Sequence, residues 1–183
     1  MQEERVIRSD KIYEGKVVTL RCDTVEMEGQ RFARREIIEH SGSVAILALD
    51  EEGKIIFVNQ YRLAANDFLL ELPAGLIDRG ESPIDAAKRE LKEETGYEAQ
   101  ELNFLFEFYT SPGFTNERIH LFCAEGLTPG DQDLDETENI SLVSLSLEEA
   151  MKKIRLGAIL DAKTILGILS LWGRKNQGGN HDK

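Results

Sequence analysis

The residues best suited to chemistry are three glutamates, Glu90, Glu93 and Glu94, in one predicted helix. At about 100° per residue, positions i, i+3 and i+4 share one side of a helix. Three carboxylates there repel one another by roughly 0.2–0.5 kcal/mol per pair, and they lie near the helix C-terminus, where negative charge is disfavoured. A hard divalent cation, Mg²⁺ or Mn²⁺, would remove that conflict. The alternative is a solvated acidic face with Lys88 and Lys92 nearby.

The segment around these glutamates follows a fixed pattern. Five residues separate Gly75 from Glu81, seven more precede Arg89, and the chain continues ELKEETGY from Glu90. This resembles the Nudix box, G-x5-E-x7-R-E-U-x-E-E-x-G-U, where U is a bulky aliphatic residue. Tyr97 is the one departure, because it is bulky but aromatic. The resemblance implies an α/β protein with the Nudix fold, an α/β/α sandwich with a mixed sheet, that cleaves a nucleoside diphosphate linked to another moiety.

The resemblance also implies roles for residues of the box. Glu90 and Glu94 would be the principal metal ligands, Ala74 would offer its backbone carbonyl, and Glu93 would take a supporting catalytic role. Arg89 and Glu81 would brace the loop–helix–loop rather than touch substrate. The physical chemistry agrees, because divalent ions neutralise a pyrophosphate, orient it and acidify the attacking water.

A second acidic segment, residues 134–140, resembles the mobile loop that supplies the general base in this family. The resemblance assigns Glu136 as the base and Glu138 as a further metal ligand, with Glu93 as the candidate base if that assignment fails. A carboxylate near a metal ion can accept a proton from water whose pKa the metal has lowered. The alternative is an ordinary solvated loop.

The substrate is indicated by Ser111-Pro112-Gly113 and Glu117. Pro112 lies 16 residues after Gly96, and this spacing and the S-P-G-x-x-x-E pattern resemble Nudix enzymes that act on ADP-ribose. Glu117 would accept hydrogen bonds from ribose hydroxyls. Without the Nudix box, the same segment would be read as an ordinary Pro-Gly turn.

Two arginines extend the likeness to the same subfamily. Arg35 and Arg62 stand in segments that resemble its substrate contacts, and a guanidinium can bind the oxygens of a diphosphate or terminal ribose in bidentate fashion. Two surface arginines with no role in binding are the alternative.

The elements that must position these residues alternate between strands and helices. A Ser82 cap, Pro83 at the first position and Gly96 at the end predict a helix over 83–95. Ser146 with Glu149 predicts a second helix, and a third is predicted from about Asp161 to a stop at Gly173. Strands are expected at 17–27, 32–39, 44–49, 55–58, 68–72, 101–109, 119–124 and 140–145.

The predicted organisation has three parts. Residues 1–40 form an N-terminal antiparallel strand extension, residues 41–174 the Nudix hydrolase domain, and residues 175–183 a flexible tail. The resemblance implies a homodimer in which the extension exchanges between subunits and helps bind the adenine side. The extension must also bury Val17, Leu20 and Phe32 somewhere.

Composition excludes several classes of protein. The net charge is 22 − 34 = −12, which argues against nucleic acid and against membrane binding through a basic patch. The N-terminus has no apolar signal core, so we expect a cytoplasmic protein. Cys22 and Cys123 form no C-x-x-C pair and read as reduced cysteines. A P-loop motor or kinase is excluded because its G-x-x-x-x-G-K-[ST] motif is missing from the sequence.

The sequence therefore predicts Mg²⁺-dependent hydrolysis of ADP-ribose, a small-molecule nucleoside diphosphate sugar, to AMP and ribose 5-phosphate, with Mn²⁺ as a possible substitute. One alternative is a pyrophosphatase for another nucleotide sugar, such as GDP-mannose or ADP-glucose, because these enzymes share chemistry and differ in pocket contacts. Another is a non-catalytic Nudix-fold binding module. An RNA 5′-end hydrolase conflicts with the acidic charge.

Overall fold

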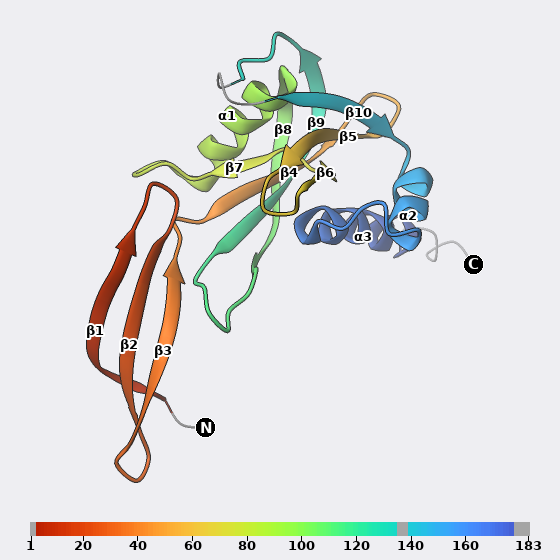
Figure 1. The fold of residues 1–183 in the computed structure, drawn as a ribbon. Helices are drawn as coiled ribbons and strands as arrows, with labels where there is room; N and C mark the ends of the chain where they lie inside the picture. The colour runs from red at the N-terminus through yellow and green to blue at the C-terminus, as the bar shows by residue number, and fades with distance from the viewer. Residues whose placement is uncertain (1–2, 135–138, 178–183) are drawn as a thin grey trace. The chain divides into compact units, whose positions relative to one another are not determined.

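The computed structural model describes residues 3–134 and 139–177, and the chain forms two compact units (Figure 1). One unit combines the chain up to Gly42 with Phe108–Ile119, and the other combines Ser43–Glu107 with the chain from His120 onwards. The predicted α/β class, with a mixed sheet and an N-terminal antiparallel sheet, is confirmed.

The first unit contains a three-stranded antiparallel sheet in the order β1-β2-β3. Its strands are β1 (Arg5–Glu14), β2 (Thr19–Met27) and β3 (Arg31–Glu39). The sequence predicted β2 and β3 but missed β1. Nearly every residue of β1 is exposed, so it lacks the alternation of buried and polar positions that marks a strand. Backbone pairing with β2 along its length holds β1 instead.

A second element of the first unit is the hairpin tip at residues 108–119. The backbone N–H of Ile38 donates to the Phe114 carbonyl at 2.8 Å, and that of Asn116 donates to the Ile38 carbonyl at 3.3 Å. The Asn116 side chain also accepts from the His40 backbone N–H at 2.8 Å. These bonds join residues 114–116, which follow the Ser-Pro-Gly segment, to the end of β3, a long-range contact that sequence spacing does not encode.

The second unit is built on a seven-stranded sheet in the order β10-β5-β4-β9-β8, with β6 pairing with β5 and β7 with β4. The strands are β4 (Ser43–Leu49), β5 (Ile55–Arg62), β6 (Asp67–Glu71), β7 (Ala74–Leu76), β8 (Tyr97–Tyr109), β9 (Arg118–Pro129) and β10 (Ile140–Leu145). The sequence missed β7, which is only three residues long, and ended β5 four residues early.

Helices cover both faces of this sheet (Figure 1). Successive side chains of β4 point to opposite faces, so Val44 and Ile46 pack with Leu91 of α1 (Pro83–Thr95). Leu47 lies on the face of α3, near the point where Gly167 approaches the sheet. Val44, Ile46, Leu47 and Leu91 are each at most 1 % exposed. Strand β4 therefore lies at the centre of the core.

The helix boundaries test the predicted capping signals. The Ser82 cap, the Pro83 start and the left-handed Gly96 (φ 75°) are as predicted, and Ser146 forms a capping box with Glu149 before α2 (Leu147–Arg155). The predicted stop at Gly173 is wrong, because α3 spans Ala162–Gln177. An interior glycine costs only about 1 kcal/mol, which the packing of this helix against the sheet can offset. Within the described residues, no helix is long and apolar enough to cross a membrane.

Candidate active site

Helix α1 carries the predicted metal-binding glutamates beside its buried stripe, and Glu94 is itself buried. Ala86, Ala87 and Leu91 are at most 1 % exposed and fix the rotation of the helix against the sheet. The side chain of Glu90 is 13 % exposed and that of Glu93 36 %. The acidic face is therefore partly enclosed by protein, in contrast to an ordinary solvated helix face.

Arg89 ties the helix to the segment that precedes it. Its Nε and Nη2 atoms each lie 3.0 Å from a Glu81 oxygen, and Nη2 also donates to the Leu76 carbonyl at 2.9 Å. Glu81 in turn accepts from the backbone N–H of Asp78 at 3.0 Å. The hydrogen bond from Arg89 holds the pKa of the Glu81 carboxyl below its usual range. Arg89 and Glu81 thus brace the loop before the helix, the role that the resemblance implies.

The same guanidinium also contacts two of the acidic residues on the helix. Arg89 Nη1 lies 2.7 Å from Glu90 Oε1 and 2.9 Å from Glu93 Oε2. One positive charge is thus shared among three carboxylates, counting Glu81, which leaves an excess of negative charge at this position. We call Arg89 with Glu81, Glu90 and Glu93 the helix cluster.

Two glutamates converge on the short strand β7. Glu94, only 3 % exposed, accepts a hydrogen bond from the Ala74 backbone N–H at 2.9 Å. The carboxyl group of Glu90 lies against Gly75 so closely that a Cβ on Gly75 would be 1.9–2.2 Å from its atoms. The glycine that opens the Nudix box therefore leaves room for the Glu90 carboxyl, which would have to move if position 75 carried a side chain.

The donor set around β7 fits a divalent cation. The residues that could hold one are Glu90, Glu94 and the carbonyl of Ala74, all oxygen donors that suit Mg²⁺ or Mn²⁺. Within residues 3–134 and 139–177, no group of three or more His, Cys, Asp or Glu side chains forms a complete metal cage. Such a cage is unnecessary, because Mg²⁺ commonly takes one or two carboxylates and fills its remaining positions with water and substrate phosphate.

The start of the acidic loop packs on the C-terminal end of α1. The backbone N–H of Asp133 donates to the Glu93 carbonyl at 3.1 Å, and the Gln132 side chain donates to the Glu94 carbonyl. Gly96 lies directly against Gly130, whose carbonyl oxygen would be 2.6 Å from a Cβ at position 96. Glu136 and Glu138, the predicted base and further ligand, lie outside the described residues.

Arg62, a predicted substrate residue, binds a buried glutamate in the second unit. Its Nε and Nη2 atoms lie 2.7 and 2.9 Å from the two oxygens of Glu71, which is 1 % exposed. Burial alone would raise the pKa of Glu71, but its bonds with Arg62 and Lys163 outweigh burial and hold that pKa below the usual range. Sequence reasoning missed Glu71 and Lys163, because residues 92 positions apart show no spacing signal.

Arg35 and Glu117, the other predicted substrate residues, belong to the first unit. The Arg35 guanidinium binds both carboxylate oxygens of Glu4. Glu117 accepts a hydrogen bond from the Thr110 hydroxyl at 2.8 Å, and its other oxygen lies 3.8 Å from His40 Nε2. Each side chain already has polar partners that fix its orientation.

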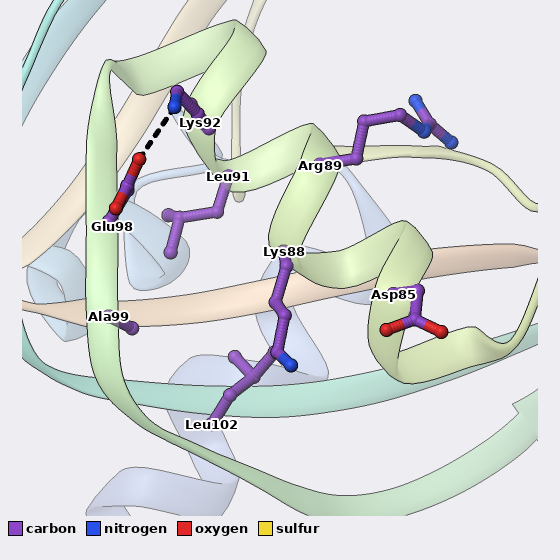
Figure 2. Close-up of a pocket in the computed structure, with 8 residues that line it drawn as sticks. All are labelled: Asp85, Lys88, Arg89, Leu91, Lys92, Glu98, Ala99 and Leu102. Atoms are coloured by element: carbon purple, nitrogen blue, oxygen red, sulfur yellow. Dashed lines mark hydrogen bonds and ion pairs between the residues drawn. The ribbon is translucent and has the colours of Figure 1, made fainter.

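Helix α1 also borders a hollow of about 400 Å³, shown in Figure 2. Leu91 and Leu102 line it together with Lys88, while Lys92 reaches across to Glu98 at 2.6 Å. The Arg89 guanidinium points away from these residues in Figure 2. Neither Glu90 nor Glu94 lines this hollow, so it is distinct from the candidate metal position.

Several proteins of known description resemble this chain over most of its length. An "ADP-ribose pyrophosphatase" of Bacillus subtilis (strain 168) is 42% identical over 168 residues, covering 91% of each chain. A "Methanol dehydrogenase activator" of Bacillus methanolicus matches with the same identity and coverage. An "ADP-ribose pyrophosphatase" of Mycobacterium tuberculosis (strain ATCC 25618 / H37Rv) is 37% identical and covers 90% of this chain and 81% of its own.

A solved structure and a family model agree on the fold. The structure, described as "Crystal structure of ADP compounds hydrolase", superposes with a TM-score of 0.86 over 97% of each chain at 24% identity. The family model for the NUDIX domain matches residues 39–165, the stretch that contains both glutamates facing β7. Nudix hydrolases generally use divalent metal ions, which suits the oxygen donors at this position. This chain belongs to the NUDIX family.

Proposed function

We propose that this protein is a Mg²⁺-dependent ADP-ribose pyrophosphatase that releases AMP and ribose 5-phosphate. The observation that carries the proposal is the convergence of Glu90 and Glu94 on the Ala74–Gly75 backbone inside an intact Nudix box. The substrate follows from the two relatives named ADP-ribose pyrophosphatases and from the Ser-Pro-Gly segment that precedes Glu117.

The residues of the chain divide the work of this reaction. Bound Mg²⁺ would neutralise the charge of the pyrophosphate and lower the pKa of the attacking water. Arg62 and Arg35 would bind oxygens of the diphosphate or terminal ribose, and Glu117 would accept hydrogen bonds from ribose hydroxyls. The bonds that these side chains make within each unit hold them in one orientation before substrate arrives.

We further propose Glu136 as the general base and Glu138 as a metal ligand. Asp133, three residues before Glu136, is bonded to the end of α1, which supports a base delivered beside Glu93 and Glu94. Glu136→Gln is then expected to lower kcat by roughly 10²–10⁴-fold with little change in binding. Glu138→Gln should instead weaken metal binding in the presence of substrate. Exchanged phenotypes would shift the assignment by two residues, and an unchanged kcat in both would move the base to Glu93.

A substrate panel tests the overall proposal. ADP-ribose, ADP-glucose and GDP-mannose are incubated with Mg²⁺ or Mn²⁺, and the products are identified by mass. ADP-ribose should give the highest kcat/KM. A preference for GDP-mannose would favour the alternative supported by the "GDP-mannose pyrophosphatase" of Cronobacter sakazakii (strain ATCC BAA-894), which is 35% identical over 73% of this chain.

A regulatory role is the second candidate, because one equally similar relative is named a methanol dehydrogenase activator. A non-catalytic regulator would show no metal-dependent turnover of any member of the panel. Turnover by the wild type that is lost in Glu94→Gln would rule out a purely non-catalytic module.

We also propose a cytoplasmic homodimer whose N-terminal strands, residues 1–40, exchange between subunits. Its other parts would be the hydrolase domain at 41–174 and a tail at 175–183, whose first three residues form the end of α3. Large apolar side chains on the first unit support an interface: Val6, Ile12, Tyr13, Val17 and Phe32 are each more than half exposed. Light scattering should give a dimer for the full chain and a monomer when residues 1–40 are removed. A monomeric full chain would overturn the exchange. We propose no nucleic acid or membrane partner.

A further inference from the structure

A second group of charged side chains lies where β5, β6 and the start of α3 meet. Glu71 binds Arg62 through both oxygens, and Lys163 Nζ binds Glu71 and lies 3.0 Å from Asp161 Oδ1. Two positive and two negative charges therefore balance. We call Arg62, Glu71, Asp161 and Lys163 the strand cluster.

The strand cluster is a rigid part of the second unit. The side chains of Glu71 and Lys163 are 2 % and 12 % exposed. Asp161 caps α3 by accepting from the Thr164 backbone N–H at 3.0 Å and from its hydroxyl at 2.6 Å. Thr164, which is fully buried, accepts from the Leu72 backbone N–H at 2.8 Å. Lys163 is thus held between two carboxylates that are themselves fixed.

Arg62 is the one cation of the strand cluster with substantial access to solvent, because 42 % of its side chain is exposed. Glu71 occupies the Nε and Nη2 edge of its guanidinium, and the fork geometry leaves the Nη1 edge for another oxygen. Hydrogen bonding to Glu71 raises the pKa of Arg62, and the negative charge of Glu94 also contributes. The guanidinium is therefore within electrostatic reach of the candidate metal position.

Lys163 sets the net charge of the strand cluster, which is the charge that a substrate approaching Arg62 would meet. With Lys163 present, both carboxylates are balanced and Arg62 needs only one edge to hold Glu71. Without it, the strand cluster carries a net charge of −1, so Arg62 is drawn towards two acids and an approaching anion is repelled. Arg62 alone already satisfies both oxygens of Glu71, which means that hydrogen bonding of Glu71 does not by itself require the lysine.

We propose that Lys163 is a positioning residue for the hydrolysis. It neutralises Glu71 and Asp161 together, so that Glu71 holds Arg62 by one edge while the Nη1 edge binds a phosphate oxygen of the substrate. This inference rests on the proposed function, because it takes the ligand of Arg62 to be a diphosphate.

A change of charge at position 163 gives the first test. Lys163→Met keeps the length of the side chain and removes its charge. KM for ADP-ribose should rise about tenfold, equivalent to about 1.4 kcal/mol, while kcat should change by less than about threefold. Lys163→Arg should keep KM within about threefold of the wild type. Thermal melts establish whether each variant is folded. If Lys163→Met does not fold, Lys163→Gln takes its place.

A compensating change separates charge balance from packing. Asp161→Asn removes one negative charge, and asparagine remains a good N-cap. Added to Lys163→Met, it makes the strand cluster neutral again, so the double variant should recover KM to within about threefold of the wild type. A purely structural role for Lys163 predicts that the second substitution adds to the damage. This double-mutant cycle isolates the coupling between the two positions.

A matched control on the same helix is Ile168→Val, because Ile168 is fully buried and lies outside the strand cluster. It should lower the melting temperature and leave KM unchanged. An unchanged KM in Lys163→Met, or failure of Asp161→Asn to restore it, would overturn the proposal.

Calorimetry with inorganic pyrophosphate in metal-free buffer separates this proposal from the proposed function. If the wild type does not hydrolyse ADP-ribose, the proposed function fails. The affinity for pyrophosphate should still fall about tenfold in Lys163→Met and recover in the double variant. Equal pyrophosphate affinity in the wild type and Lys163→Met would refute the role of Lys163 whatever the natural substrate.

Discussion

The helix cluster and the strand cluster each join an arginine to glutamates, but they balance charge differently. Arg89 contacts three carboxylates, whereas Arg62 and Lys163 together contact Glu71 and Asp161. The carboxylates of the helix cluster are 13–36 % exposed, while Glu71 is 2 % exposed.

The difference shows how one domain can serve two purposes with the same residue types. Excess negative charge is tolerable where water and a divalent cation can reach it, and it creates affinity for that cation. A carboxylate shielded from water must have its charge matched within the protein, because an uncompensated buried charge costs several kcal/mol. The helix cluster, which contains the candidate metal ligand Glu90, is therefore suited to a place beside a metal, and the strand cluster is suited to holding a fixed geometry.

The largest expected effect comes from breaking the balance of the strand cluster. Glu71→Gln leaves Arg62 and Lys163 without their buried counter-charge, so the free energy of unfolding should fall by about 3–5 kcal/mol. Urea denaturation measures it. Glu98→Gln is the control, because Glu98 forms an exposed pair with Lys92, and its removal should cost at most about 1 kcal/mol. Equal losses in both variants would contradict the distinction between the clusters.

At the candidate metal position we expect a large loss of activity with little loss of stability. Glu90→Gln and Glu94→Gln should each lower kcat at least about 10²-fold, because a group that helps to stabilise transition-state charge is lost. Glu90→Gln should change the free energy of unfolding little, since Arg89 keeps Glu81 and Glu93. Steady-state kinetics over a Mg²⁺ titration supply the measurement. Near-normal turnover in both variants would contradict the assignment of Glu90 and Glu94 as metal ligands.

The contact between Gly75 and Glu90 allows a smaller test. Gly75→Ala places a methyl group where the Glu90 carboxyl now lies, so that carboxylate must move. We expect the Mg²⁺ concentration for half-maximal activity to rise about tenfold, a displacement effect rather than loss of a ligand. Gly173→Ala is the control, because a Cβ there meets nothing within 4 Å. Unchanged Mg²⁺ dependence in Gly75→Ala would show that the position of Glu90 is unimportant.

The smallest effect is expected in how the free energy of unfolding depends on pH below neutrality. The folded-state pKa of Glu71 is lowered from 4.5, so its contribution is fully present above that unfolded value. The contribution is lost as pH falls through the lowered folded-state pKa, because the folded protein then takes up the proton as well. Unfolding free energies measured between pH 7 and pH 3 should decline less steeply in Glu71→Gln. The same decline with pH in the wild type and in Glu71→Gln would show that protonation of Glu71 does not cause the loss of stability in acid.

Sequence reasoning succeeded where the signals are local. The cap at Ser82, the proline after it and Gly96 lie within one helix length, so the bounds of α1 could be read directly. The family pattern predicted that Arg89 and Glu81 brace the loop–helix–loop, and in the structure the two side chains bind each other. Arg62, Arg35 and Glu117 were chosen by likeness, and their roles remain predictions.

Long-range contacts were beyond the sequence. Lys163 meets Glu71 only because α3 packs on the sheet, and nothing in either local sequence indicates that pairing. Strand β7 is too short for a periodic pattern and depends on its pairing with β4. The helix continues beyond Gly173 for a related reason, since the cost of an interior glycine can be offset by packing of α3 on the sheet, which the local sequence does not show.

The burial of both cysteines has a practical consequence for chemical labelling. Cys22 and Cys123 are unpaired and at most 6 % exposed, and burial raises the pKa of Cys123 to about 11. The thiolate is the reactive form, so Cys123 should be nearly inert to alkylating reagents at neutral pH, and Cys22 is shielded by the fold. A single cysteine introduced at exposed Glu101 should therefore carry a fluorophore selectively in the native protein, without prior removal of the natural thiols.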